Sequence, residues 1–380
     1  MRRALLAVVV LAAALAVPVQ ASDIESARTA EGPRIDASAW YLVGEDGVVL
    51  AQRNARRARA VASITKLMTV LVALEHARPS DVVRVSPLAA QVGGSTIFLR
   101  AGDELTVAEL VRGALIPSAN DAATALAAHV GDGSLARFVS LMNAEARELG
   151  LRDTSFVNPH GLDAAGHVSS ARDATVLVRH ALGVPIVRDA LSRSSFSHPA
   201  GREFETTNDL LSWPPLVGGK TGHTEDAGWS QAAAATGRGT TVYGTVLGGD
   251  TRAKRNDALE TLLRYGLASY RRVAAIDATR VYAEAETGYG RPFVELVAPR
   301  TVTRTVLGTR SLLERVVAPT VVGLPITKGQ RLGRVEVWDR DRLVASSNLV
   351  AAETVSEPGL FGKAKWFAER TASNLWELVS

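Results

Sequence analysis

The sequence predicts an α/β domain over residues 22–272, a small all-β domain over 273–355 and a helical segment over 356–380. Three observations support this reading. A short hairpin pattern opens the first domain, helical patterns fill its middle, and three strand patterns followed by a helix close it. Past residue 272, β-branched runs instead alternate with Gly and Pro turns, without helical periodicity.

The composition is that of ordinary globular domains, with 380 residues, 22% charged, 47% hydrophobic and no cysteine. At about 150 residues per domain, this length suggests two or three domains. The lack of cysteine excludes disulfides, thiolate metal sites and a cysteine nucleophile. The isoelectric point of about 9.5 comes from scattered arginines. Their densest cluster, within residues 53–59, has no interleaved aromatics, so we expect no nucleic-acid partner.

The N-terminus has the pattern of an export signal. Arg2 and Arg3 precede an apolar run over residues 5–17, and Val19-Gln20-Ala21 places small residues at both recognition positions of a cleavage site. The run is shorter than the about 20 residues that cross a bilayer. We therefore expect residues 1–21 to be a signal peptide and the mature protein to be exported.

Local patterns predict each element of the α/β domain. Gly and Pro end the helical patterns, while alternating or β-branched runs bounded by turn residues mark the strands. In chain order we expect a hairpin of Ala39–Val43 and Val48–Ala51, helices within 63–78, 107–130 (interrupted at Pro117) and 135–149, a loop over 152–166, strands at 216–223, 229–235 and 240–248, and a helix over 255–270.

The C-terminal part combines strands with an amphipathic tail. Strands are expected at Arg300–Leu307, Arg315–Val322 and Arg334–Trp338. The tail places one apolar stripe on a helix, formed by Leu360, Ala364, Phe367, Thr371, Leu375 and Leu378 and flanked by Phe361, Trp366 and Trp376. Its net charge is only +1, so membrane association would depend on apolar area and tryptophans. Docking of the tail on the β domain is the alternative.

Three short motifs suggest nucleophilic catalysis. In Ser63-Ile64-Thr65-Lys66, residues three apart share a helix face, so the Ser63 hydroxyl can face the Lys66 amine. A lysine with a pKa of about 10.4 is protonated at neutral pH and cannot act as a base. It must therefore be desolvated or lie beside another cation, and Lys220 could be that cation if its strand runs beside the Ser63 helix.

The other two motifs are Ser118-Ala119-Asn120 and Lys220-Thr221-Gly222. In a loop before a helix, Ser118 and Asn120 can point the same way, one relaying a proton and the other holding a substrate amide. The third motif is expected on an edge strand, where Gly222 leaves room for a ligand backbone. Together and in this order, the motifs are those of β-lactamases and penicillin-binding proteins.

The chain resembles the D-alanyl-D-alanine carboxypeptidases of the low-molecular-mass penicillin-binding proteins over nearly its whole mature length. Besides the three motifs, the resemblance includes Phe156-Val157-Asn158-Pro159-His160-Gly161-Leu162, the extended segment 219–224, the β domain and the tail from Phe361. It implies a β-lactamase/transpeptidase-like fold, an antiparallel sheet with helices on both sides. Val61 departs from the family, which often has proline there.

The resemblance also implies a mechanism without metal or organic cofactor. Ser63 attacks the penultimate carbonyl of a peptidoglycan stem peptide, Lys66 takes its proton, and Ser118 passes a proton to the leaving D-alanine. The substrate would be bound by Asn120, Lys220, Thr221 and Gly222. The His223 backbone N–H would lie in the oxyanion hole, and Arg255 would assist carboxylate recognition. β-Lactams would acylate the same serine. The tail would attach the protein to the periplasmic face of the cytoplasmic membrane.

Other functions remain open at this point. A class A β-lactamase needs a deacylating glutamate, and no E-x-x-L-N segment occurs in the chain. An endopeptidase would use the same residues, and a non-catalytic penicillin-binding sensor would not need all three motifs. A zinc site is disfavoured, because no H-E-x-x-H occurs and the pair His160 and His167 lacks a third ligand in the sequence.

Overall fold

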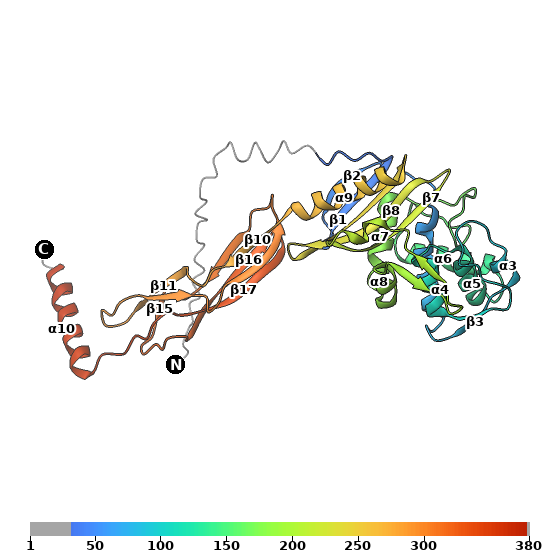
Figure 1. Cartoon of the computed structure of the whole chain (residues 1–380). Helices are drawn as coiled ribbons and strands as arrows, with labels where there is room; N and C mark the ends of the chain where they lie inside the picture. Colours follow the sequence, from blue (N-terminus) through green and yellow to red (C-terminus); the bar gives the residue numbers. More distant parts are fainter. Residues whose placement is uncertain (1–31, 378–380) are drawn as a thin grey trace. The chain divides into compact units, whose positions relative to one another are not determined.

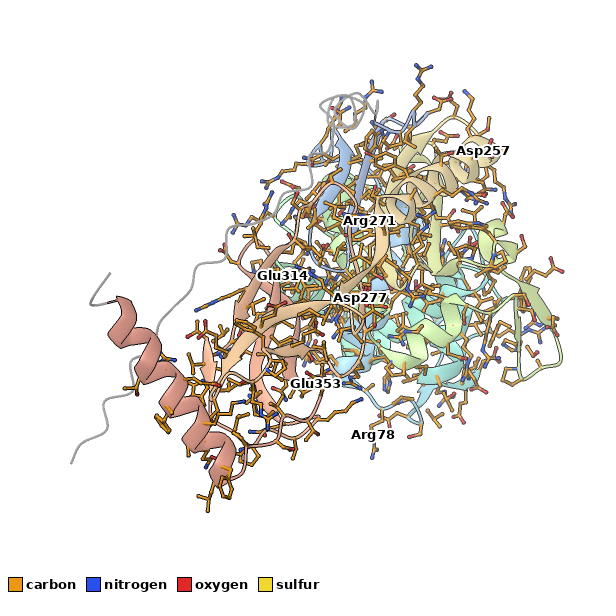
Figure 2. The ribbon with its side chains drawn as sticks, turned by 90° about the vertical axis from the view of Figure 1, so that its left-hand side faces the viewer. Arg78, Asp257, Arg271, Asp277, Glu314 and Glu353 are labelled. Atoms are coloured by element: carbon orange, nitrogen blue, oxygen red, sulfur yellow. The ribbon has the colours of Figure 1, made fainter. Side chains whose placement is uncertain are left out.

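The computed structural model describes residues 32–377, with side chains up to Thr371. These residues form two compact units, 32–270 and 271–377 (Figure 1). Figure 2 shows the side chains, with the exposed residues Arg78 and Asp257 labelled in the first unit and Glu314 and Glu353 in the second. The predicted signal peptide lies outside the described residues.

The first unit is built on a five-stranded antiparallel sheet in the order β2-β1-β9-β8-β7. Its strands are β1 (Ala39–Gly44), β2 (Val49–Arg53), β7 (Leu216–Thr224), β8 (Gly228–Gly237) and β9 (Thr240–Gly249). The N-terminal hairpin therefore pairs with the last strand of the unit, and β7 forms one edge. The predicted hairpin and the three closing strands are confirmed, each within about two residues.

Helices cover both faces of this sheet (Figure 1). Successive residues of a strand point to opposite faces, and β9 shows both environments. Gly244 lies against Leu263 of α9 (Arg252–Ala268), while the Thr245 hydroxyl accepts a buried hydrogen bond from Thr175 of α7 (Ala171–Ala181). The fold class predicted from the sequence, an antiparallel sheet between helices, is confirmed.

The remaining helices pack around α2 (Lys66–His76). Residues 66–73 of α2 are all buried, so this helix is the centre of the helical group. Its neighbours are α4 (Val107–Leu115), α5 (Asn120–Val130), α6 (Leu135–Glu148) and α7. Pro117 separates α4 from α5, as predicted, and Thr106 begins α4 with a capping box to Glu109. The short helices α3 (Pro87–Ala90) and α8 (Pro185–Leu191) complete the group.

The second unit is mainly β structure. A six-stranded sheet has the order β14-β16-β17-β12-β11-β15, and β10 (Tyr270–Ile276) pairs with β13 (Val302–Leu307). The sheet comprises β11 (Val281–Thr287), β12 (Val294–Val297), β14 (Leu313–Val317), β15 (Val321–Val322), β16 (Arg331–Asp339) and β17 (Arg342–Ala351). Its core is formed by alternating aliphatic residues such as Leu296, Val335 and Leu349. Helix α10 (Leu360–Glu377) follows, as predicted.

Some elements had no prediction. The sequence analysis assigned neither helices α7 and α8 nor strands β10, β11, β12 and β17 of the second unit. It also missed the small hairpins β3 (Val82–Arg84) with β4 (Glu104–Thr106), and β5 (Ser195–Ser197) with β6 (Glu203–Glu205). The segment Arg315–Val322, predicted as one strand, is divided between β14 and β15. Short three-residue strands carry too little pattern to be recognised.

Candidate active site

Ser63 lies in a short 3-10 turn, Ala62–Thr65, directly before α2. Side chains three residues apart eclipse each other in a 3-10 turn, and the Nζ of Lys66 lies 2.6 Å from the Oγ of Ser63. Ala62, just before the serine, has a φ of 48°, which is unfavourable for a residue with a Cβ atom. Such strain is retained only where surrounding contacts fix the backbone.

The loop 158–161 supplies those contacts. Asn158 folds the loop, since its side-chain oxygen accepts from the Gly161 backbone N–H at 2.7 Å. The carbonyl of His160 accepts a hydrogen bond from Lys66 Nζ at 2.9 Å, and that of Pro159 accepts from the Thr69 hydroxyl at 2.5 Å. Gly161 has a φ of +89°, and a Cβ there would lie 2.0 Å from the Ala62 carbonyl oxygen. The loop therefore packs directly against the nucleophile turn.

A buried histidine, His167, also holds this loop in place. His167 Nδ1 accepts from the Val157 backbone N–H at 3.0 Å, so its Nε2 carries the proton and donates to Thr65 Oγ1 at 2.8 Å. Burial lowers the pKa of His167 to about 4. This histidine is thus a neutral structural link between the loop and the turn. The described residues contain no group of three or more His, Asp or Glu side chains arranged to bind a metal ion.

The surroundings of Lys66 lower its pKa and so favour an amine that can accept a proton. Its side chain is fully buried, and this burial lowers the pKa of Lys66 well below the usual value, with the charge of Lys220 lowering it further. The carboxylate of Asp121 acts in the opposite direction on that pKa. A neutral amine can donate an N–H to His160 and still accept the hydroxyl proton of Ser63.

Lys220 connects the sheet edge to the second motif. Its Nζ donates to Ser118 Oγ at 2.8 Å and to the Thr221 carbonyl at 3.1 Å. Burial and the nearby Arg255 lower the pKa of Lys220 to about 7. Ser118 has a φ of 66° and is buried, so its hydroxyl is held by backbone geometry as well as by this hydrogen bond.

Asn120 begins α5 beside a short loop that forms another wall of the site. Its side-chain N–H donates to the Gly93 carbonyl at 2.7 Å, and its backbone N–H donates to the Ser95 carbonyl at 2.6 Å. The next residue, Asp121, accepts from the backbone N–H groups of Ile97 and Leu99. The start of α5 therefore holds loop 93–99 in place.

The third motif lies on the edge strand β7, as predicted from the sequence. Thr221 Oγ1 is 2.6 Å from the Oγ1 of Thr207, and the ring of His223 stacks on Trp229 with centroids 4.0 Å apart. At Gly222 a Cβ would lie 2.7 Å from the Val61 carbonyl oxygen and 3.2 Å from the Ser63 nitrogen. The space at Gly222 is thus filled by the nucleophile turn, whereas the sequence analysis assigned it to a ligand. A glycine is needed because two backbones approach closely.

Arg255 lies in the first turn of α9 and is almost fully buried. Its guanidinium donates to Asn256 and to Asp209 Oδ2, the latter at 3.3 Å, and lies 5.7 Å from the centre of the Trp229 ring. Burial lowers the pKa of Arg255 to about 10. At neutral pH it still carries a full positive charge, next to the strand that bears Lys220 and Thr221.

Several site residues were missed in the sequence. Asp121, Thr207 and Asp209 each bond directly to a motif residue or to its loop, yet none belongs to a motif. His160 lies in a segment quoted for the family resemblance, but the contact of its carbonyl with Lys66 was not predicted. A backbone carbonyl gives no signal in a sequence. Residues 207 and 209 meet Thr221 and Arg255 through the pairing of distant segments, which local pattern cannot indicate.

Comparison with known proteins identifies the family. The family model for D-alanyl-D-alanine carboxypeptidase, peptidase S11, matches residues 26–251. The D-alanyl-D-alanine carboxypeptidase DacD of Escherichia coli is 34% identical over 352 residues, covering 87% of this chain and 90% of the relative. The chain belongs to the D-alanyl-D-alanine carboxypeptidase family. It is a serine peptidase related to the low-molecular-mass penicillin-binding proteins.

Further relatives agree with this assignment. DacF of Bacillus subtilis, also a D-alanyl-D-alanine carboxypeptidase, is 31% identical over 346 residues, covering 87% of this chain and 89% of the relative. Among solved structures, penicillin-binding protein 5 from Haemophilus influenzae matches with a TM-score of 0.63 and 28% identity, covering 86% of this chain and 99% of the other. The similarity therefore extends well beyond the residues matched by the family model.

The contact between Gly161 and the nucleophile turn leads to a first prediction. Gly161→Ala should slow acylation of the enzyme about 100-fold, since small displacements of reacting groups can cost that much. Stopped-flow measurement with a chromogenic β-lactam would give the rate. Gly166→Ala is a matched control, because Gly166 has a similar φ of +80° but its nearest neighbouring atom is 3.9 Å from a Cβ. Equal slowing in both variants would contradict the proposed role of the contact.

The buried neutral His167 leads to a second prediction, on stability. Its pKa is about 4 in the folded protein and about 6.5 in an unfolded chain. Below pH 6.5 the unfolded state binds a proton that the folded state does not, so the free energy of unfolding falls between pH 6.5 and 4, by about 3 kcal/mol at most.

Urea denaturation at pH 7 and pH 4.5 would measure this loss. The His167→Gln variant should lose less stability on acidification than the wild type, because it lacks the titrating ring. His180→Gln changes an exposed histidine of α7 and should retain the wild-type pH dependence. An equally steep loss in His167→Gln and the wild type would refute the assignment.

Proposed function

We propose that this enzyme removes the terminal D-alanine from peptidoglycan stem peptides through an acyl-enzyme on Ser63. The observation that carries this proposal is the 2.6 Å contact between Ser63 Oγ and a fully buried Lys66 amine. A serine needs a base for attack on an amide. Burial beside Lys220 favours the neutral amine of Lys66, which can accept the proton of the serine.

Acylation forms one bond and breaks one bond at the carbonyl carbon, with two proton transfers. Ser63 Oγ bonds to the penultimate carbonyl carbon while its proton moves to Lys66 Nζ. The C–N bond to the terminal D-alanine then breaks, and the leaving amine receives a proton through Ser118 Oγ, which Lys220 holds at 2.8 Å. The backbone N–H groups of Ser63 and His223 stabilise the negative charge that develops on the carbonyl oxygen.

The substrate is held from two sides. Asn120, at the start of α5, and the edge strand β7 align the peptide backbone of the stem. Thr221, Lys220 and the buried Arg255 place hydroxyl and positive charge at the same end of the strand, which suits the free carboxylate of the terminal D-alanine.

Water then hydrolyses the ester and regenerates Ser63. β-Lactams, whose strained amide imitates the dipeptide, would acylate Ser63 in the same way.

Substitution of the nucleophile and its base tests this mechanism. Ser63→Ala should abolish covalent labelling by fluorescent penicillin, and Lys66→Ala should slow acylation by about 10²–10⁴-fold, the usual contribution of a general base. Mass spectrometry of a peptide ending in D-Ala-D-Ala should show loss of one alanine with the wild type and the control variant, and none with Ser63→Ala. Lys328→Ala, an exposed lysine of the second unit, is the control.

Two results would count against the proposal. Labelling that survives in Ser63→Ala would remove Ser63 as the nucleophile. An intact pentapeptide together with a stable penicilloyl adduct on wild-type Ser63 would instead indicate a sensor or an endopeptidase.

The tail is proposed to attach the enzyme to the membrane surface. Leu360 and Phe361 of α10 are 87% and 95% exposed, and Phe367 is also exposed. Trp366 and Phe367 contact Tyr289, so part of the helix does pack on the second unit. No helix among residues 32–377 is long and apolar enough to span a bilayer. The exposed apolar residues therefore favour attachment in the interface plane, at the outer face of the cytoplasmic membrane.

Deletion of residues 358–380 should move the enzyme from the membrane fraction to the soluble fraction without affecting cleavage of soluble peptides. Phe361→Ser with Leu360→Ser should have the same effect if exposed apolar area is the cause. Retention of both variants in the membrane pellet would show that another part of the chain anchors the protein. Immunoblotting of the two fractions measures the distribution.

A further inference from the structure

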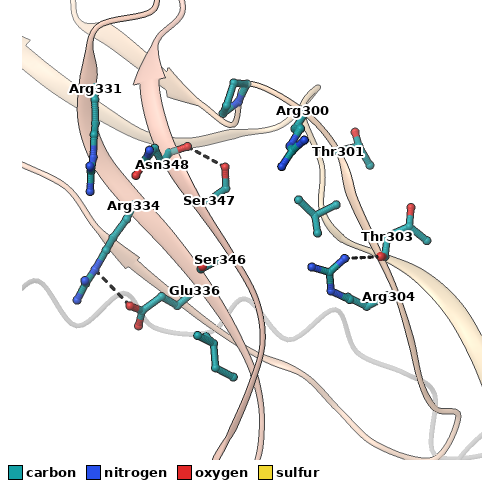
Figure 3. Close-up of a pocket in the computed structure, with 13 residues that line it drawn as sticks. Arg300, Thr301, Thr303, Arg304, Arg331, Arg334, Glu336, Ser346, Ser347 and Asn348 are labelled. Carbon is teal, nitrogen blue, oxygen red and sulfur yellow. Dashed lines mark hydrogen bonds and ion pairs between the residues drawn. The ribbon is translucent and has the colours of Figure 1, made fainter.

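The second unit contains an open groove with a volume of about 740 Å³, far along the chain from the catalytic motifs. Figure 3 shows that it lies between the segment 299–304 and the strands β16 and β17. Four arginines line it, Arg300, Arg304, Arg331 and Arg334, together with hydroxyl and amide side chains. We call it the arginine groove.

Strand alternation explains why the groove is polar. On β16, Val335 and Val337 face the core of the unit. Arg334 precedes Val335 and Glu336 lies between the two valines, so both point to the opposite face of the sheet. The register of β16 with β17 places Asn348 opposite Arg334 and Ser346 opposite Glu336. The same face of the sheet is therefore lined by a continuous set of polar side chains.

The charge of the groove is strongly positive. Glu336 is its one acidic lining residue and is paired with Arg334 at 3.2 Å. Among the described residues, the guanidinium of Arg304 donates only to the neutral carbonyls of Val344 and Thr303. Arg300 and Arg331 are exposed and form no side-chain hydrogen bond or ion pair with any residue that the structure describes. Within the part of the chain that the structure describes, three positive charges of the groove thus have no counter-charge.

This composition indicates the chemistry of a ligand. Arginine forks bind carboxylate and phosphate groups through paired hydrogen bonds. Only two aliphatic side chains, Val302 and Leu343, and Pro299 line the groove, and no aromatic ring does. Stacking of nucleic-acid bases and insertion into lipid both need apolar or aromatic surface. The groove is therefore suited to a polar chain that carries repeated negative charges.

We propose that the arginine groove binds the carboxylates of uncleaved and cleaved stem peptides on the same peptidoglycan polymer that the active site processes. This proposal rests on the proposed function. Every stem that is not cross-linked ends in a free carboxylate before D-alanine is removed and again afterwards, so the polymer offers many such groups. A second contact to one polymer raises the overall affinity by keeping the enzyme at high effective concentration.

The test compares full-length enzyme variants in binding to purified peptidoglycan sacculi that are free of lipid. Arg300→Ser with Arg331→Ser should weaken binding about tenfold or more, because hydrogen bonds to charged groups are lost, and added salt should weaken wild-type binding. Arg291→Ser with Arg342→Ser removes the same charge from exposed positions outside the groove and should bind like the wild type. Release of D-alanine from a soluble peptide should be unchanged in both variants.

Three outcomes would overturn the inference. The first is unchanged sacculus binding in the groove variant, the second is equal weakening in the control variant, and the third is weakened sacculus binding that added salt does not affect. If the groove variant binds sacculi normally but loses binding to vesicles of anionic phospholipid, the groove is a lipid headgroup site. Failure of the proposed function is separate, because it would appear as a wild type that leaves the soluble peptide intact, whereas sacculus binding is measured without turnover.

Discussion

The site depends on the burial of two lysines side by side. Lys66 and Lys220 are both almost completely removed from solvent, and their charges disfavour each other. A buried ammonium is costly, so the amine of Lys66 is held in a form that can accept a proton. The fold tolerates this arrangement because each amine keeps hydrogen bonds, Lys66 with Ser63 and His160 and Lys220 with Ser118.

The two lysines come from different layers of the first unit, so the site forms only where these layers meet. Lys66 begins the central helix of the helical group, whereas Lys220 lies on the edge strand of the sheet. They can approach only where the sheet edge contacts the nucleophile turn, and Gly222 allows that approach. Loop 158–161 closes the other side of the turn. Displacement of either contact would shift the nucleophile turn relative to the strand that bears Lys220.

The two faces of the sheet in the second unit differ in composition. Its inner face is aliphatic, and the outer face of β16 and β17 carries the arginine groove. The sequence analysis predicted a strand within β16 but not β17, and it found in the densest arginine cluster no pattern that indicates nucleic-acid binding. Arg300 and Arg331 are 31 positions apart in the chain, so their common groove could not be seen before the strands were paired.

Sequence alone determined the fold class, the main strands and helices of the first unit, and the family, because hydrophobic periodicity and short motifs are local properties. Ser63 and Lys66 could be paired in advance, since their spacing fixes their geometry within one turn. Only the tertiary structure decided what surrounds that pair. The carbonyl of His160, the link through His167 and the contact at Gly222 arise between segments remote in sequence, and their effect depends on burial, which no local pattern specifies.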